Sequence, residues 1–100
     1  MIISIKVHKA YRDIVAICDL ELIGKKFEAN NFQLDVKENF YKGDELSIKE
    51  AIELMKDYAK EDATFNIIGE KSTEAALKAG IISKEGVKRV RGVPFALVLL

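Results

Sequence analysis

The most constraining feature of the chain is its last segment, because residues 92–100 form a run of nine residues without a charge. Residues 95–100 are apolar at every position, and the turn-forming triplet Gly92-Val93-Pro94 comes directly before them. This pattern predicts a strand that is entered through a fixed turn. A strand with no polar alternation is typical of a central position covered on both faces. At a sheet edge, the same strand is instead expected to pair with a second copy of the chain.

The length and composition predict a single domain over residues 1–100. Of the 100 residues, 49% are hydrophobic, which suffices for one core of its own. The uncharged run is far shorter than the ~20 residues needed to cross a bilayer, and the alternating N-terminal residues do not resemble a signal peptide. The single cysteine, Cys18, excludes an intramolecular disulfide. We therefore expect a cytoplasmic protein with no membrane partner.

The charges are balanced in number but unevenly distributed. Sixteen basic residues face sixteen acidic ones, so the formal net charge is 0. Residues 35–62 carry five basic and nine acidic side chains, whereas residues 63–100 carry six and three. The C-terminal third therefore has a net charge of +3, which favours contact with a polyanion there rather than along the whole molecule.

The first half of the chain predicts three strands. Alternation of apolar and polar residues indicates strands at 3–7 and 32–36, the second extending toward residue 41, and the short, β-branched apolar run at 14–18 indicates another. A hairpin with the two-residue loop Arg12-Asp13 would join the first two strands and place Lys6 opposite Asp19. Residues 25–29 are expected to form a loop, and residues 42–44 a turn.

The second half predicts two helices and three further strands. Ser47 and Glu50 form a capping box before a helix over 48–60. A second helix is expected to be capped by Ser72 or Thr73 and to end before Gly80. Strands are expected at 63–68, 87–90 and 95–100. The order β-β-β-α-β-α-β-β predicts an α+β domain with two layers, in which two helices cover one face of a mainly antiparallel sheet.

Five short segments follow one another in an order that resembles a small archaeal family known as domain of unknown function 424. They are residues 19–27 (DLELIGKKF), 40–43 (FYKG), 66–70 (NIIGE), 79–81 (AGI) and 92–94 (GVP). The resemblance implies an archaeal, cytoplasmic, single-domain protein and no known activity. The family pattern continues its last motif with histidine and alanine, but Phe95 stands at the histidine position here. Any chemistry of that histidine in relatives would therefore be lost in this chain.

The leading candidate site is basic. Two arginines two residues apart in a strand share one face and can follow a phosphate backbone. The alternative is a solvated edge strand that charge protects from aggregation. The residues predicted to contact nucleic acid are Lys84, Lys88, Arg89, Arg91, Lys25 and Lys26.

Other candidate sites are weaker. The junction 68–72 joins a strand to a helix, so the amides of Gly69 and Ser72 are predicted to bind an anion, although most such junctions are only caps. One cysteine and one histidine cannot form a four-ligand zinc site, and no calcium-loop pattern is present. The two-residue hairpin loop would place His8 and Cys18 on opposite faces of the sheet, which argues against a catalytic dyad, whereas a bulge or a longer loop would allow one. We therefore expect no metal, no cofactor and no catalytic residue.

Three hypotheses about function follow from these observations. The first is a non-catalytic module that binds RNA or a ribonucleoprotein of the translation machinery. The second is a protein-interaction subunit that forms a homodimer through its apolar C-terminal strand. The third is a small enzyme or ligand-binding protein that uses the carboxylates of Asp19 and Glu21 together with Lys25 or Tyr41.

Overall fold

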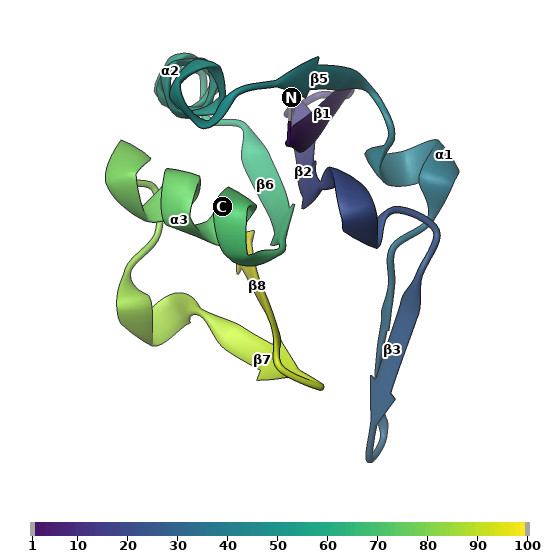
Figure 1. Ribbon diagram of the computed structural model, residues 1–100. Helices are drawn as coiled ribbons and strands as arrows, with labels where there is room; N and C mark the ends of the chain where they lie inside the picture. Colours follow the sequence, from purple (N-terminus) through teal and green to yellow (C-terminus); the bar gives the residue numbers. More distant parts are fainter. Residues whose placement is uncertain (1, 100) are drawn as a thin grey trace.

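The computed structural model describes residues 2–99, which fold around a mixed sheet of six strands in the order β5-β1-β2-β6-β8-β7 (Figure 1). The pair β2–β6 is parallel, and the other four pairs are antiparallel. The strands are β1 (Ile3–His8), β2 (Ile14–Asp19), β5 (Asp44–Leu46), β6 (Thr64–Ile68), β7 (Lys88–Val90) and β8 (Val93–Val98).

Two helices, α2 (Ile48–Lys60) and α3 (Glu70–Ala79), cover one face of this sheet and enclose the main hydrophobic core. The predicted capping box of α2 is confirmed. The Glu50 N–H donates to Ser47 Oγ at 3.2 Å, and the Ser47 N–H donates to Glu50 Oε1 at 2.9 Å. Gly80 ends α3 in the left-handed conformation that glycine adopts without strain, with φ of 79°.

The opposite face of the sheet is covered only in part. The hairpin of β3 (Lys26–Ala29) and β4 (Phe32–Asp35) extends away from the sheet and is followed by the short helix α1 (Glu38–Tyr41) (Figure 1). Two short 3-10 turns, η1 (Leu20–Leu22) and η2 (Lys84–Gly86), complete the elements. A second, smaller core lies between these elements and the sheet, formed by Ala16, Cys18, Leu34, Val36, Tyr41 and Ile68.

The predicted fold class is confirmed, since two helices lie on one face of a mainly antiparallel sheet. The prediction missed β3, α1 and β5. The sequence predicts a loop at residues 26–29, because Phe27 packs against the smaller core but its neighbours Lys26 and Glu28 are charged and exposed. Residues 38–41 were assigned to the end of a strand but form α1, and residues 44–46 pair with β1 through their backbone. Within residues 2–99, no helix is long and apolar enough to cross a membrane.

The predicted register of the first hairpin is wrong. Its connection spans residues 9–13 rather than two residues, so His8 pairs with Ile14 and Lys6 lies opposite Ala16. The Lys6 ammonium donates to the Asn39 carbonyl at 2.7 Å instead of pairing with Asp19. The longer loop also places His8 and Cys18 on the same face, because Cys18 pairs with Ser4. They are four positions apart in register, about 14 Å along the strand.

The expectation of a central, fully covered C-terminal strand is also wrong. Strand β8 lies second from the edge, between β6 and the short strand β7. Pro94 and Ala96 are buried, but Leu97 is 56% exposed and Leu99, just past the strand, is 73% exposed. The turn before β8 consists of Arg91 and Gly92, whereas the sequence predicted the triplet 92–94.

Candidate functional site

A cleft of about 380 Å³ lies at the ends of the parallel strands β2 and β6, beside the turn between β7 and β8. Three of the five segments that carry the family resemblance meet here: residues 19–27, 66–70 and 92–94. Parallel strands end at the same edge of a sheet, which explains why the first two segments converge. The lining residues are Asp19, Glu21, Leu22, Gly69, Glu70, Lys71, Gly92, Val93 and Pro94.

Asp19 organises the inner wall of the cleft. Its Oδ1 accepts from the Ser72 N–H at 2.8 Å and from the Ser72 hydroxyl at 2.7 Å, and its Oδ2 accepts from the Lys71 N–H at 3.0 Å. Asp19 is only 4% exposed and Ser72 is fully buried. The carboxylate therefore caps the N-terminus of α3, where the helix dipole and the free amides favour a negative charge.

Gly69 makes this cap possible. It precedes α3 with φ of 111° and ψ of 159°, a conformation that only glycine adopts readily. A Cβ at this position would overlap the Asp19 carboxylate. The glycine is required here both by its backbone conformation and by the close approach of an aspartate from fifty residues earlier in the chain.

The cap changes the interpretation of the predicted anion site. The Ser72 N–H donates to Asp19, and the Gly69 N–H donates to the Pro94 carbonyl at 2.8 Å. Both predicted amides are thus engaged within the protein, and an external anion would have to displace Asp19. The predicted helix start is also wrong, because α3 begins at Glu70, and the Thr73 hydroxyl donates to the Gly69 carbonyl at 2.8 Å.

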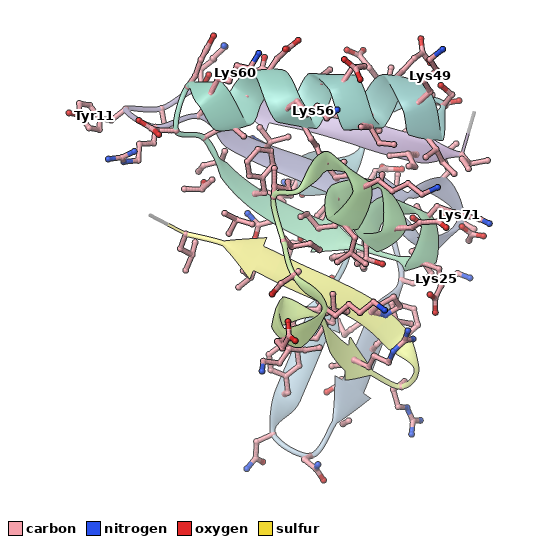
Figure 2. The ribbon with its side chains drawn as sticks, turned by 90° about the vertical axis from the view of Figure 1, so that its left-hand side faces the viewer. Tyr11, Lys25, Lys49, Lys56, Lys60 and Lys71 are labelled. Carbon is pink, nitrogen blue, oxygen red and sulfur yellow. The ribbon has the colours of Figure 1, made fainter. Side chains whose placement is uncertain are left out.

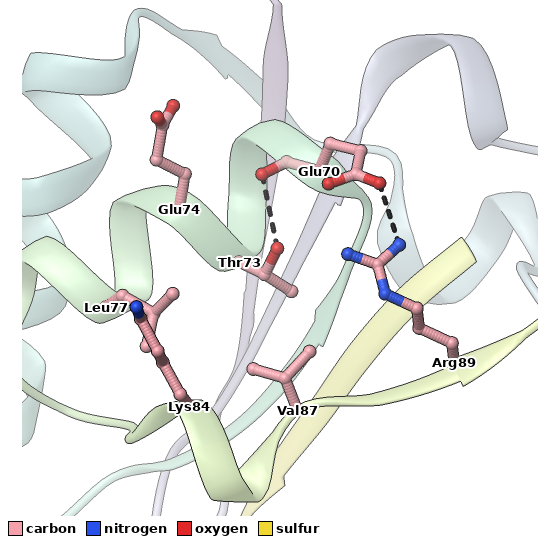
Figure 3. Close-up of a pocket in the computed structure, with 7 residues that line it drawn as sticks. All are labelled: Glu70, Thr73, Glu74, Leu77, Lys84, Val87 and Arg89. Atoms are coloured by element: carbon pink, nitrogen blue, oxygen red, sulfur yellow. Dashed lines mark hydrogen bonds and ion pairs between the residues drawn. The ribbon is translucent and has the colours of Figure 1, made fainter. Parts of the chain in front are cut away.

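Arg89 is not a free cation. Its guanidinium donates to Glu70 Oε2 at 2.9 Å and to the Gly92 carbonyl at 2.9 Å (Figure 3). Both side chains are more than half exposed, so the pair contributes little to stability. The contact nevertheless offsets the charge of Glu70 and ties the β7–β8 turn to the start of α3.

Other cations stand around the cleft. Lys71 lines it directly, and Arg91 lies beside Gly92 in the turn. The Lys25 N–H donates to the carbonyl of Leu22, which also lines the cleft. Lys25 and Lys71 lie on the same side of the molecule in Figure 2, below α2. Within residues 2–99, Lys25, Lys71 and Arg91 form no ion pair.

The remaining predicted basic residues do not join this group. Lys84 lies in a separate hollow on the helix side of the sheet, lined also by Thr73, Glu74 and Val87 (Figure 3). Lys88 lies on the opposite face of β7, beside Phe32 and Phe95. Lys26 begins β3 opposite Asp35. The six predicted residues therefore form no single patch.

The buried groups near the cleft are unsuited to acid–base chemistry. Burial and the neighbouring charge of Asp19 raise the pKa of the Cys18 thiol to about 12, and burial raises the pKa of Tyr41 to about 12. Both stay protonated at neutral pH. Each carboxylate oxygen of Asp19 already accepts a hydrogen bond, so this residue has a structural role in the cap. Among residues 2–99, no three His, Cys, Asp or Glu side chains are placed to hold a metal.

The sequence reasoning missed Lys71 and the role of Asp19. Lys71 follows the motif at 66–70 directly, and that position is the available sign of its place on the cleft. The cap could be suspected from an aspartate at the end of one buried strand and a glycine at the end of another. That inference requires knowing that the two strands are parallel neighbours.

Comparisons with known proteins identify relatives without a described activity. The family model described as "Protein of unknown function (DUF424)" matches residues 8–100. An uncharacterised conserved protein from Methanopyrus kandleri has a similar crystal structure, with a TM-score of 0.87 and 20% sequence identity. The similarity covers 98% of this chain and 90% of that one, and at this identity it shows the fold alone. No match was found among curated proteins.

Proposed function

Because the chain belongs to the DUF424 family of proteins of unknown function, we propose a function from the cleft itself: a non-catalytic module that binds RNA, free or within a ribonucleoprotein of the translation machinery. The proposal keeps the cytoplasmic location expected from the sequence. It moves the predicted interface from β7 to the cleft at the ends of β2 and β6.

The balance of charges around the cleft carries the proposal. Arg89 pairs with Glu70, and the amides of α3 surround the carboxylate of Asp19, so these charges are largely offset inside the protein. Asp19 and Glu21 are the carboxylates on the cleft that take part in no ion pair within residues 2–99. The three cations Lys25, Lys71 and Arg91 oppose these two carboxylates, which leaves an excess of one positive charge. A positive rim of this kind attracts a phosphate backbone.

The floor of the cleft suits part of a nucleotide. Leu22 and Val93, both half-buried, give it an apolar surface, on which a ribose or the face of a base can pack. Its volume of about 380 Å³ is at the small end of the range for ligand sites, and it is open to solvent. We therefore expect contact with one or two nucleotides of an unpaired segment and weak preference for sequence.

Fluorescence anisotropy with a labelled oligouridine of about twelve nucleotides tests the proposal over a series of salt concentrations. We expect binding that weakens as salt rises. The double variant Lys71→Gln/Arg91→Gln should flatten the slope of log K against log salt by about 1.4, since each phosphate contact on a single strand contributes about 0.7.

The control variant Lys56→Gln/Lys60→Gln removes the same charge from α2, toward the end of that helix away from Lys25 and Lys71 (Figure 2). It should leave the slope nearly unchanged. Equal losses in the two double variants would show that binding is a general charge effect and not a property of the cleft. Absence of binding at about 50 mM salt would refute the proposal.

A further inference from the structure

The outer edge of β8 is paired along only part of its length. The β7–β8 hairpin closes with the two-residue turn of Arg91 and Gly92, whose φ angles are 54° and 81°. Val90 pairs with Val93, and Lys88 pairs with Phe95. Strand β7 starts at Lys88, so the part of β8 after Phe95 has β6 on one side and, within residues 2–99, no strand on the other.

The alternation of the hairpin shows which backbone groups are free. In a two-residue hairpin, the residues that close the turn exchange hydrogen bonds, and every second residue does the same. Val93 and Phe95 therefore direct their N–H and C=O groups toward β7. Leu97 continues this alternation and directs its own groups past the end of β7, into the open edge.

The side chains at this edge are apolar and exposed. Leu97 is 56% exposed, Leu99 is 73% exposed and Phe32 is 46% exposed. Phe32 stacks on Phe95 with ring centroids 5.2 Å apart, and together they border a hollow of about 310 Å³ beside Leu97. Exposed apolar groups that lie together in this way are typical of an interaction surface.

Other edge segments of the sheet are protected by charge. Strand β5 carries Asp44 and Glu45, and β7 carries Lys88 and Arg89. Charged side chains on edge strands prevent unwanted pairing between molecules. Residues 92–99 contain no charge, so the open part of β8 carries no such protection of its own, and the charge nearest to it is Lys88, which borders the same hollow from β7.

We propose that this edge pairs antiparallel with the same edge of a second copy of the chain, around a twofold axis at Val98. In this register Leu97 exchanges backbone hydrogen bonds with Leu99 of the partner subunit. Their side chains then lie on one face together with Phe32 and Phe95. A register centred on Leu97 would instead pair Leu99 with Phe95 of the partner subunit. Phe95 is already paired with Lys88 of β7, so this register is blocked.

The chemistry of the edge favours a second copy over another partner. The segment is uncharged and its apolar groups can face themselves across a twofold axis, as an isologous interface requires. The formal net charge of the chain is 0, so two copies do not repel each other at long range. A partner chosen by charge would find no complementary group on residues 96–99.

Sedimentation equilibrium from about 10 to about 500 µM tests the proposal, because a homodimer responds to concentration. The mass should rise from 11.2 kDa toward twice that value. Leu97→Asp/Leu99→Asp should weaken the dimer at least tenfold. Tyr11→Asp, a fully exposed control on the β1–β2 loop and outside the proposed register, should leave it unchanged. Circular dichroism of each variant verifies that it is folded.

A cysteine at the twofold axis tests the register independently. Oxidised Val98→Cys should form a covalent dimer, because the two Val98 positions face each other, while Tyr11→Cys should not. A monomer at the highest concentration, or a dimer that Leu97→Asp/Leu99→Asp does not weaken, would refute the interface. A dimer without cross-linking at residue 98 would refute the antiparallel register.

Discussion

Asp19→Ala should lower the free energy of unfolding by about 3 kcal/mol, because it removes the cap of α3 from a buried position. Loss of a helix cap alone typically costs about 1 kcal/mol. Here the change also leaves the Ser72 hydroxyl and the Ser72 and Lys71 amides without their acceptor, at about 1–3 kcal/mol for a fully buried group. The contributions are not additive, since one carboxylate makes all three contacts.

Asp19→Asn separates the charge from the geometry. The asparagine oxygen can keep both Ser72 contacts, but its NH₂ group would face the Lys71 N–H, donor against donor. We expect a cost of about 2 kcal/mol, between wild type and the alanine variant. Glu21→Ala is the matched control, an exposed carboxylate two residues away for which a change within about 0.5 kcal/mol is expected.

Urea denaturation followed by circular dichroism measures these differences, provided that the transition is two-state. Added formate should restore part of the stability of Asp19→Ala, because formate can place a carboxylate in the space that the aspartate leaves. Chloride at equal ionic strength should have a smaller effect on this variant, and formate should have a smaller effect on Glu21→Ala. A loss below about 1 kcal/mol in Asp19→Ala would refute the assignment of Asp19 as the cap that stabilises α3.

Two further predictions concern stability. The pKa of Cys18 is about 12 in the folded protein and near 9 in the unfolded chain. The contribution of the protonated thiol to the free energy of unfolding is therefore complete below pH 9 and falls as the pH rises toward 12. When the pH is raised from about 7 to about 10.5, the free energy of unfolding of wild type, measured by urea titration, should fall by about 2 kcal/mol more than that of Cys18→Ala. Equal decreases in the two proteins would contradict the burial of the thiol. Ser47→Ala should cost about 1 kcal/mol by removing the capping box of α2, and a cost no larger than that of Lys49→Ala in the same assay would contradict it.

The sequence predicted those elements whose signals are local. The capping box of Ser47 and Glu50 involves residues three apart, and the start of α2 was therefore predicted correctly. Alternation gave β1 and β4 because Ile3 and Ile5 face the main core and Leu34 faces the smaller one. Strand β5 was missed because Asp44 and Glu45 are exposed, so its pairing with β1 depends on backbone groups that leave no pattern in the side chains.

The candidate site could not be predicted because it depends on pairing between distant strands. Asp19 meets α3 only because β2 and β6 are parallel neighbours, and no local pattern encodes that choice. The same holds for Arg89, whose contact with Glu70 requires the position of β7 at the edge of the sheet. A sequence pattern can identify a charged residue, but whether its charge is free depends on the tertiary fold.

The turn between β7 and β8 has a consequence for how the protein balances folding against binding. Among residues 2–99, the residues other than glycine with positive φ are Asn30, Asp62 and Arg91. Asparagine and aspartate tolerate this conformation, whereas arginine adopts it at a cost of roughly 1 kcal/mol. Asparagine at position 91 would suit the hairpin better but would remove a cation from the rim of the cleft. If the cleft binds RNA, stability and affinity therefore oppose each other at this one residue.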